Sequence, residues 1–207
     1  MLYCAPPPAF AAAPRETEMA SLPPRIPPVL PDTMTEAQRA VAARIAGGPR
    51  GGVRGPFLAL LQDPELADRV QQLGEFIRYG TGLPKTLSEL AILVAARRWG
   101  CQYEWFAHAP IAREVGVDPT VIEAIAAGRR PDELDTDASA VYAFCTNLHA
   151  TGDAGEAPIA HIAQRFGMKG VVDLVALTGY YSLLAMVLNT ARLPLPGDAP
   201  DPLPKLP

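Results

Sequence analysis

Apolar residues recur at intervals of three and four along most of the chain, and this spacing predicts helices. The segment 63–80 shows the pattern well: Asp63 can cap a helix, Pro64 suits its first position, and Gly80 follows the last apolar residue. No segment alternates apolar and polar residues between turn signals, as a strand would. The sequence therefore predicts an all-α protein, with seven or eight helices joined by short loops.

Capping residues and glycines set the expected ends of the other helices. Thr35 with Gln38, and Thr86 with Glu89, have the spacing of capping boxes. A glycine-rich loop at 47–56 lacks the Gly-Lys-Ser/Thr ending of a phosphate-binding loop, and we expect a mobile lid there instead. The expected helices span 35–47, 63–80, 86–100, 101–116, 118–128, 135–148, 158–166 and 171–188.

Proline is concentrated at the two ends of the chain. Of the 23 prolines, nine fall in 1–34 and six in 194–207. This composition favours extended or disordered chain over helix. We therefore expect one helical domain over 35–193, preceded by a proline-rich N-terminal segment at 1–34. The extended C-terminal tail at 194–207 is expected either to strap over a neighbouring subunit or to hang loose.

Charge and cysteine content narrow the function classes. The net charge is −4 and no stretch gathers Lys and Arg, so no nucleic-acid partner is expected. Three cysteines without a close pair fit neither a disulfide framework nor a zinc cluster, and they favour a reducing compartment. Early prolines interrupt the N-terminal apolar run before it reaches signal-peptide length. The stretch 171–188 contains Asp173 and other polar residues, which favours a buried helix over a membrane span. We expect a cytoplasmic protein.

Most of the side chains that can carry chemistry fall between residues 87 and 116. At about 100° per residue, Cys101, Glu104 and His108 project from one side of a helix and can meet at one pocket. Cys101 is expected in the first helical turn, where free amide groups and the helix dipole favour a thiolate. Glu104, four residues before His108, can orient the imidazole, and Glu89 can position it or relay protons if it points into the same pocket. The cluster predicts a site for acid–base or thiol chemistry.

Each of these residues also has a structural interpretation. Glu89 would complete a capping box, a role that is compatible with a catalytic one. Cys101 fits a small buried apolar residue, and Glu104 with His108 fits an exposed ion pair. Aromatic neighbours such as Trp105 indicate that part of this helix is buried, which favours the pocket. Cys, Glu and His at this spacing can also bind a metal ion, although we expect none.

With this spacing the segment resembles the carboxymuconolactone decarboxylase and alkylhydroperoxidase D family of AhpD-like proteins. The family's peroxidase branch has a Glu, then Cys-x-x-Cys, then a His. Here Glu89 stands twelve residues before Cys101, Glu104 replaces the second cysteine, and His108 matches the histidine. The resemblance covers residues 57–130, and the later long apolar helix is similar to that of decarboxylase-like members. It implies an AhpD-like helical bundle that assembles as a trimer or hexamer.

The missing second cysteine decides the expected chemistry. Because Glu104 occupies its position, no neighbouring thiol can resolve an oxidised Cys101, and acid–base chemistry remains. The resemblance then implies a cofactor-independent, decarboxylase-like lyase, or a related proton-transfer enzyme, for a small cyclic or aromatic-derived carboxylic acid or lactone. The expected catalytic residues are His108, Glu104, Cys101 and Glu89, and the expected substrate-binding residues are Trp105, Arg97, Tyr181 and Asn189.

Two other functions stay open. One is a thiol-dependent, alkylhydroperoxidase-type redox protein that uses Cys101, and the other is a non-catalytic helical oligomer that binds a small apolar ligand. Arg97 would hold a substrate carboxylate or would lie at the surface near a helix end. His149 and His161 are interpreted as structural, with an imidazolium at His149 complementing a helix C-terminus. The apolar fraction of 49% and the long apolar helix favour a homo-oligomer.

Overall fold

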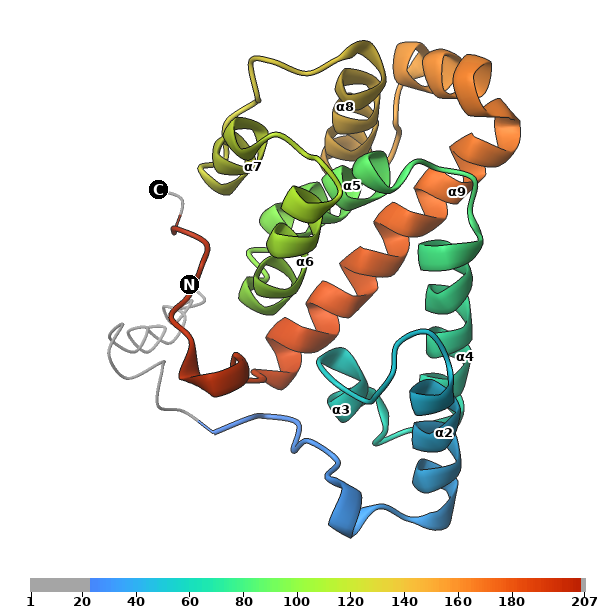
Figure 1. The fold of residues 1–207 in the computed structure, drawn as a ribbon, viewed down its shortest axis with the longest axis vertical. Coiled ribbons are helices and arrows are strands. Elements are labelled where there is room, and N and C mark those ends of the chain that lie inside the picture. The colour runs from blue at the N-terminus through green and yellow to red at the C-terminus, as the bar shows by residue number, and fades with distance from the viewer. Residues whose placement is uncertain (1–22, 206–207) are drawn as a thin grey trace, which may run out of the picture.

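The computed structural model describes residues 23–205, and over that range the chain is helical and contains no strand (Figure 1). The predicted all-α class is confirmed, with eight α-helices in the described part. They are α2 (Glu36–Gly47), α3 (Pro56–Leu60), α4 (Pro64–Glu75), α5 (Lys85–Arg98), α6 (Gln102–Glu114), α7 (Pro119–Ala126), α8 (Thr136–Thr151) and α9 (Glu156–Ala191). Shorter elements are the π-helical turn η2 (Phe76–Gly80) and the 3-10 turns η1 (Pro31–Thr33) and η3 (Pro196–Asp198).

Helix α5 lies at the centre of the bundle. Every residue from Leu87 to Ala96 is buried, and the helix packs against α6, α8 and α9. Apolar or small residues cover all of its faces except at Ser88 and Glu89, as in other fully buried helices. A carboxylate at this depth needs a partner, because burial of an unpaired charge is costly. Glu89 therefore needs a polar partner within the bundle.

Helix α9 consists of two helices joined at Gly167. This glycine has a φ of 70° and a ψ of 174°, which lie outside the helical region. Residues 168–191 then run diagonally through the molecule against α3, α5 and α8 (Figure 1). The break between the two predicted helices is confirmed. By length and composition α9 can cross a membrane, but a core helix passes the same test, and 61% of its most apolar window is buried inside the fold.

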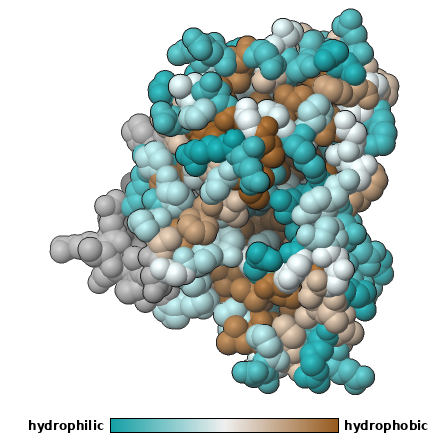
Figure 2. Space-filling model, in the orientation of Figure 1, coloured by the Kyte–Doolittle hydropathy of each residue, from teal (hydrophilic) through white to brown (hydrophobic). Residues whose placement is uncertain are grey.

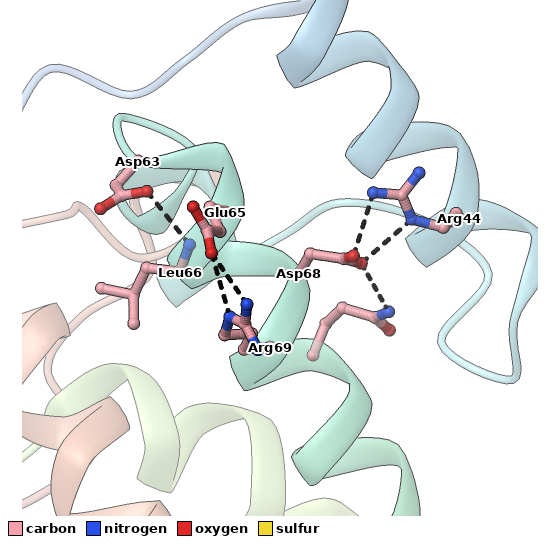
Figure 3. A network of polar contacts seen from close by, with 7 residues as sticks. Arg44, Asp63, Glu65, Leu66, Asp68 and Arg69 are labelled. Atoms are coloured by element: carbon pink, nitrogen blue, oxygen red, sulfur yellow. Dashed lines mark hydrogen bonds and ion pairs between the residues drawn. The ribbon is translucent and has the colours of Figure 1, made fainter.

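Helix α4 docks on α2 and ends in a π-helical turn. Asp63 caps α4 by accepting a hydrogen bond from the Leu66 amide at 3.1 Å, as predicted. Arg44 of α2 forms an ion pair with Asp68 at 3.0 Å (Figure 3). The single helix predicted over 63–80 is therefore α4 followed by η2. A π turn widens the helix, so the residues after Glu75 face in directions that regular helical spacing does not predict.

The two predicted capping boxes have different outcomes. At Thr35 the box forms, with reciprocal hydrogen bonds between Thr35 and Gln38. The box predicted at Thr86 is wrong, because α5 begins after Pro84 and the Thr86 hydroxyl instead donates to a backbone carbonyl at the end of α6 at 3.0 Å. Glu89 therefore has no capping role and can point into the bundle.

Both proline-rich flanks contact the bundle where the structure describes them. Val29 is buried, and its amide donates to the Leu58 carbonyl at 2.8 Å. Near the other end, the Gln102 side chain pairs with both backbone groups of Leu203, at 3.0 and 2.8 Å. The C-terminal segment thus straps over its own chain at the start of α6. Residues 1–22 of the N-terminal segment lie outside the described residues.

Candidate functional site

A buried carboxylate–imidazole pair joins α5 to α6. His108 Nδ1 lies 2.7 Å from Glu89 Oε2, and the two residues are 7% and 4% exposed. This contact fixes the orientation of the ring and leaves Nε2 without a hydrogen bond among the described residues. The sequence offered Glu104 and Glu89 for this role, and in the structure Glu89 makes the contact. Glu89 reaches His108 because α5 and α6 pack side by side.

Two tyrosines of α9 pack beside the imidazole, Tyr181 directly and Tyr180 behind it. The ring of Tyr181 meets His108 edge to face, with the ring centres 5.1 Å apart. Tyr180 packs against Tyr181 in the same manner, and its hydroxyl accepts a hydrogen bond from Arg50 Nη2 at 3.1 Å. Burial raises the pKa of both phenols, so both are neutral near pH 7. The His108 ring is thus enclosed on two sides by fixed groups.

Glu104 is a buried carboxyl group without a partner. The residue is 3% exposed, and neither of its oxygens has a hydrogen-bond partner among the described residues. Burial raises its pKa well above the usual value of 4.5, because desolvation penalises the charged form. The carboxyl group is therefore protonated at pH values that ionise an exposed Glu. In that form it can donate a hydrogen bond, which a carboxylate cannot.

These groups line one pocket with a volume of about 390 Å³. Glu104 and His108 of α6 form part of one wall, and Tyr181 and Leu184 of α9 form part of another. The glycine-rich loop before α3 and the turn η2 close the remaining sides. In Figure 2 the surface is hollowed near the middle of the view. A pocket of this size, with few polar groups among apolar ones, suits a small molecule.

Three arginines line the pocket, and none of them is among the site residues expected from the sequence. Arg50 and Arg54 come from the glycine-rich loop, and Arg78 comes from η2. Within residues 23–205 none of the three forms an ion pair with a carboxylate, so their positive charge is available to the pocket. For Arg50 and Arg54, the recurrence of Gly and Arg in the loop was the one sequence feature that could have indicated them. The π turn that brings Arg78 to the pocket has no simple sequence signature.

Cys101 lies outside this pocket. Its side chain is completely buried and packs against Ala185 and Leu188 of α9. Desolvation, followed by the nearby Glu104, raises the pKa of the thiol to about 12. The expectation of a thiolate at the start of the helix is therefore wrong. Cys101 does occupy the capping position of α6, but the cost of burying a charge there outweighs the helix dipole.

Three residues expected to bind substrate lie away from the pocket. Arg97 Nη1 donates to the Pro204 carbonyl at 2.8 Å and so holds the C-terminal strap. Asn189 Nδ2 donates to the Trp99 carbonyl at 2.8 Å, which ties α9 to the end of α5. Trp105 is 4% exposed within the hydrophobic core, because it lies one position round α6 from the residues that face the pocket. Each of the three has a structural contact instead.

The other two histidines have structural surroundings. His161 Nε2 lies 2.7 Å from Asp137, which also binds Arg165 through both oxygens. Burial lowers the pKa of His149, so the imidazolium expected there is wrong and the ring is neutral near pH 7. No group of three or more metal-ligating side chains occurs within residues 23–205.

Comparisons with known proteins agree with this fold. Four chains of solved structures match, among them the crystal structure of an uncharacterized peroxidase-related protein from Silicibacter sp. TM1040. That match has a TM-score of 0.66 and 17% identity, and it covers 84% of this chain and 94% of the other, so it shows the fold alone. No curated protein matches. The family model named carboxymuconolactone decarboxylase family matches residues 64–147, which confirms the resemblance. This segment, which includes Glu89, Glu104 and His108, is therefore similar to the carboxymuconolactone decarboxylase family.

Proposed function

We propose that this protein is a cofactor-independent lyase or related proton-transfer enzyme that acts on a small cyclic or aromatic-derived carboxylic acid or lactone. One observation carries the proposal: the Glu89–His108 pair and the unpartnered Glu104 meet at a pocket that arginines also line. Arginine can bind a substrate carboxylate, the imidazole can transfer a proton, and a neutral carboxyl group can stabilise an oxyanion. Decarboxylation next to a carbonyl group needs these three functions.

The reaction breaks the bond between the carboxylate carbon and the neighbouring carbon of the substrate. The electron pair of that bond moves into the substrate's own carbonyl or enol-lactone group, and carbon dioxide leaves. In this proposal Glu104 donates a hydrogen bond to the resulting enolate oxygen. His108 then delivers a proton from Nε2 to carbon, while Glu89 holds Nδ1 at 2.7 Å and orients the ring. Each turnover consumes one proton and releases one carbon dioxide.

The positions of the described cysteines favour acid–base chemistry over a thiol peroxidase. Cys101 lies outside the pocket and has a pKa of about 12, so little thiolate forms near neutral pH. Cys145 contacts Thr178 at 3.4 Å, whereas Cys101 packs against Ala185. These two contact points on α9 are about 10 Å apart along the helix axis. The two sulfurs therefore pack at different levels of α9, unlike the neighbouring thiols of a Cys-x-x-Cys motif.

Release of carbon dioxide from a panel of cyclic keto acids and lactone carboxylates tests the proposal. For a substrate of the wild-type protein, we expect His108→Gln to lower kcat about 10²- to 10⁴-fold, the usual contribution of a general acid. Glu89→Gln should lower kcat less and should also shift the pH–rate profile, because Glu89 acts through the imidazole. Cys101→Ser should keep the wild-type rate.

His161→Gln is the matched control for His108→Gln. His161 also lies 2.7 Å from a carboxylate, but its pair is outside the pocket, so we expect wild-type turnover from this variant. Unchanged turnover in His108→Gln would contradict the proposed mechanism. Loss of activity in Cys101→Ser, with peroxide consumed by the wild-type protein, would favour the thiol alternative. Tight binding of the acids without any turnover would favour a ligand-binding protein.

A further inference from the structure

The Arg50 guanidinium is held in a fixed position without a counter-ion. Its Nη2 donates to the Tyr180 hydroxyl at 3.1 Å, and its Cζ lies 4.8 Å from the centre of the Phe57 ring. Its Nε is buried and has no hydrogen-bond partner among the described residues. Within residues 23–205 it forms no ion pair. An anion that enters the pocket would stabilise this partly buried cation by pairing with it.

Gly74 of α4 leaves the space that the Arg50 guanidinium occupies. A Cβ atom added to Gly74 would overlap both the Tyr180 hydroxyl and Arg50 Nη2, so no larger residue fits there without a shift of one or the other. Glycine inside a helix costs about 1 kcal/mol relative to alanine. The close approach of Arg50 and Tyr180 gives that cost a structural reason. The arginine is therefore positioned by three neighbours from three different elements.

The glycine-rich loop carries Arg50 as part of the pocket wall. The Gly51 amide donates to the Gly48 carbonyl at 3.1 Å, and Gly51 and Gly55 have φ values of 66° and 59°, in the region that favours glycine. Arg54 Nη2 donates to the Arg50 carbonyl at 2.9 Å, which braces the loop from its other end. These bonds fix the backbone on both sides of Arg50.

We propose that Arg50 is the anchor for the carboxylate of an acidic ligand and makes the pocket selective for anions. With Nη2 engaged by Tyr180, the other N–H groups of the planar fork remain for an acceptor, and such a fork matches a carboxylate in geometry. Arg54 and Arg78 add positive potential from the same pocket, but neither has three positioning contacts. That the bound acid is also a substrate rests on the proposed function. The selectivity for anions does not, because binding can be measured without turnover.

Binding of benzoate, compared with its neutral isostere benzamide, tests the proposal by calorimetry. We expect the wild-type protein to bind benzoate about tenfold or more tightly than benzamide, because a charge-assisted bidentate contact is lost in the amide. Arg50→Gln should remove this preference, and Arg50→Lys should retain part of it as a charge without the fork. Gly74→Ala keeps every charge but disrupts the contact between Arg50 and Tyr180, because the added Cβ overlaps both groups, and it should lower the preference toward that of Arg50→Gln.

Two matched controls separate the proposed role from general effects of substitution. Gly179→Ala also changes a helical glycine, but no atom lies within 4 Å of the added Cβ, and Arg113→Gln removes an exposed positive charge from α6 outside the pocket. Both should bind benzoate as the wild-type protein does. Equal benzoate preference in wild type and Arg50→Gln, or no preference in the wild type, would overturn the inference. Preserved selectivity without decarboxylation of any acid would contradict the proposed function and leave the anchor in place.

Discussion

At the scale of single residues, Glu104 shows how burial alone decides the charge of a side chain. Its pKa is raised well above 4.5 in the folded protein, whereas in the unfolded chain water solvates the carboxylate. Between these two pKa values the folded state binds more protons than the unfolded state. The free energy of unfolding therefore falls as the pH rises from about 4.5 toward the folded pKa, and it stops falling above that value.

Glu104→Gln removes this dependence, since the amide does not ionise. We expect the variant to gain stability over the wild-type protein as the pH rises from about 4.5, by at most about 1.4 kcal/mol per pH unit. Urea unfolding of both proteins between pH 4.5 and pH 8 measures the difference. Glu114→Gln, at an exposed position of the same helix, should give a difference that changes little with pH. A stability difference for Glu104→Gln that stays constant over this range would mean that the buried carboxyl does not titrate as described.

Cys101 makes a second prediction at this scale. A thiol that is completely buried and has a pKa of about 12 should react slowly with Ellman's reagent at pH 7.5, and it should react fully once urea unfolds the protein. Peptide mass spectrometry after alkylation separates Cys101 from Cys145 and Cys4. Rapid modification of Cys101 in the native protein would show that α6 and α9 open locally, and it would favour a function that uses the Cys101 thiol.

At the scale of elements, signals that act within one turn of chain were readable from the sequence. The caps at Thr35 and Asp63 form as predicted, because a side-chain oxygen and an amide three residues later need no contact from another helix. The start of α5 was not readable in this way. The Thr86 hydroxyl donates to the carbonyl of Val115, the C-cap of α6, and does not cap α5. This contact depends on how α5 and α6 pack.

The residues of the candidate site also differ in whether the sequence indicated them. Glu104 and His108 share one helix, and the family spacing pointed to Glu89, so these residues were accessible to sequence reasoning. Arg50 was not, because its contact with Tyr180 joins residues 130 positions apart in the chain. Residue type and spacing thus indicated Glu89, Glu104 and His108, whereas the contact between Arg50 and Tyr180 became visible only in the folded protein.

The kink in α9 leads to a prediction about two glycines of the same helix. Gly167 has a φ of 70°, a value that is strained for alanine, so Gly167→Ala should lower the free energy of unfolding by about 1–2 kcal/mol. Gly179 has helical geometry and open space around its Cβ position, and Gly179→Ala should raise the free energy of unfolding by up to about 1 kcal/mol. Urea unfolding of the two variants gives the comparison. If Gly167→Ala were as stable as Gly179→Ala, the two halves of α9 would form one continuous helix in solution.

At the scale of the whole molecule, two stripes of exposed apolar side chains lie on neighbouring helices. On α9 beyond the kink they are Met168, Val172, Val175, Leu183 and Met186, and on α4 and η2 they are Leu66, Leu73 and Phe76. Lys169 lies over the Phe76 ring at 5.6 Å, and Leu66 and Met186 line one apolar groove, so the stripes meet near both ends. Extensive exposed apolar surface is typical of protein interfaces. We propose that a second copy of this chain covers it.

The mass of the protein in solution tests this assembly. The chain has a mass of 22.0 kDa, and we expect light scattering to give a trimer or hexamer of that unit. Val175 is 45% exposed near the middle of the α9 stripe, so Val175→Glu should leave the monomer folded but place a charge in the interface and dissociate the oligomer. Ala150→Glu puts the same charge on an exposed position of α8, away from both stripes, and should keep the wild-type mass. A monomeric wild-type protein, or a Val175→Glu variant with unchanged mass, would contradict this use of the face, because an interface built on these two helices cannot bury an unpaired carboxylate at its centre without weakening.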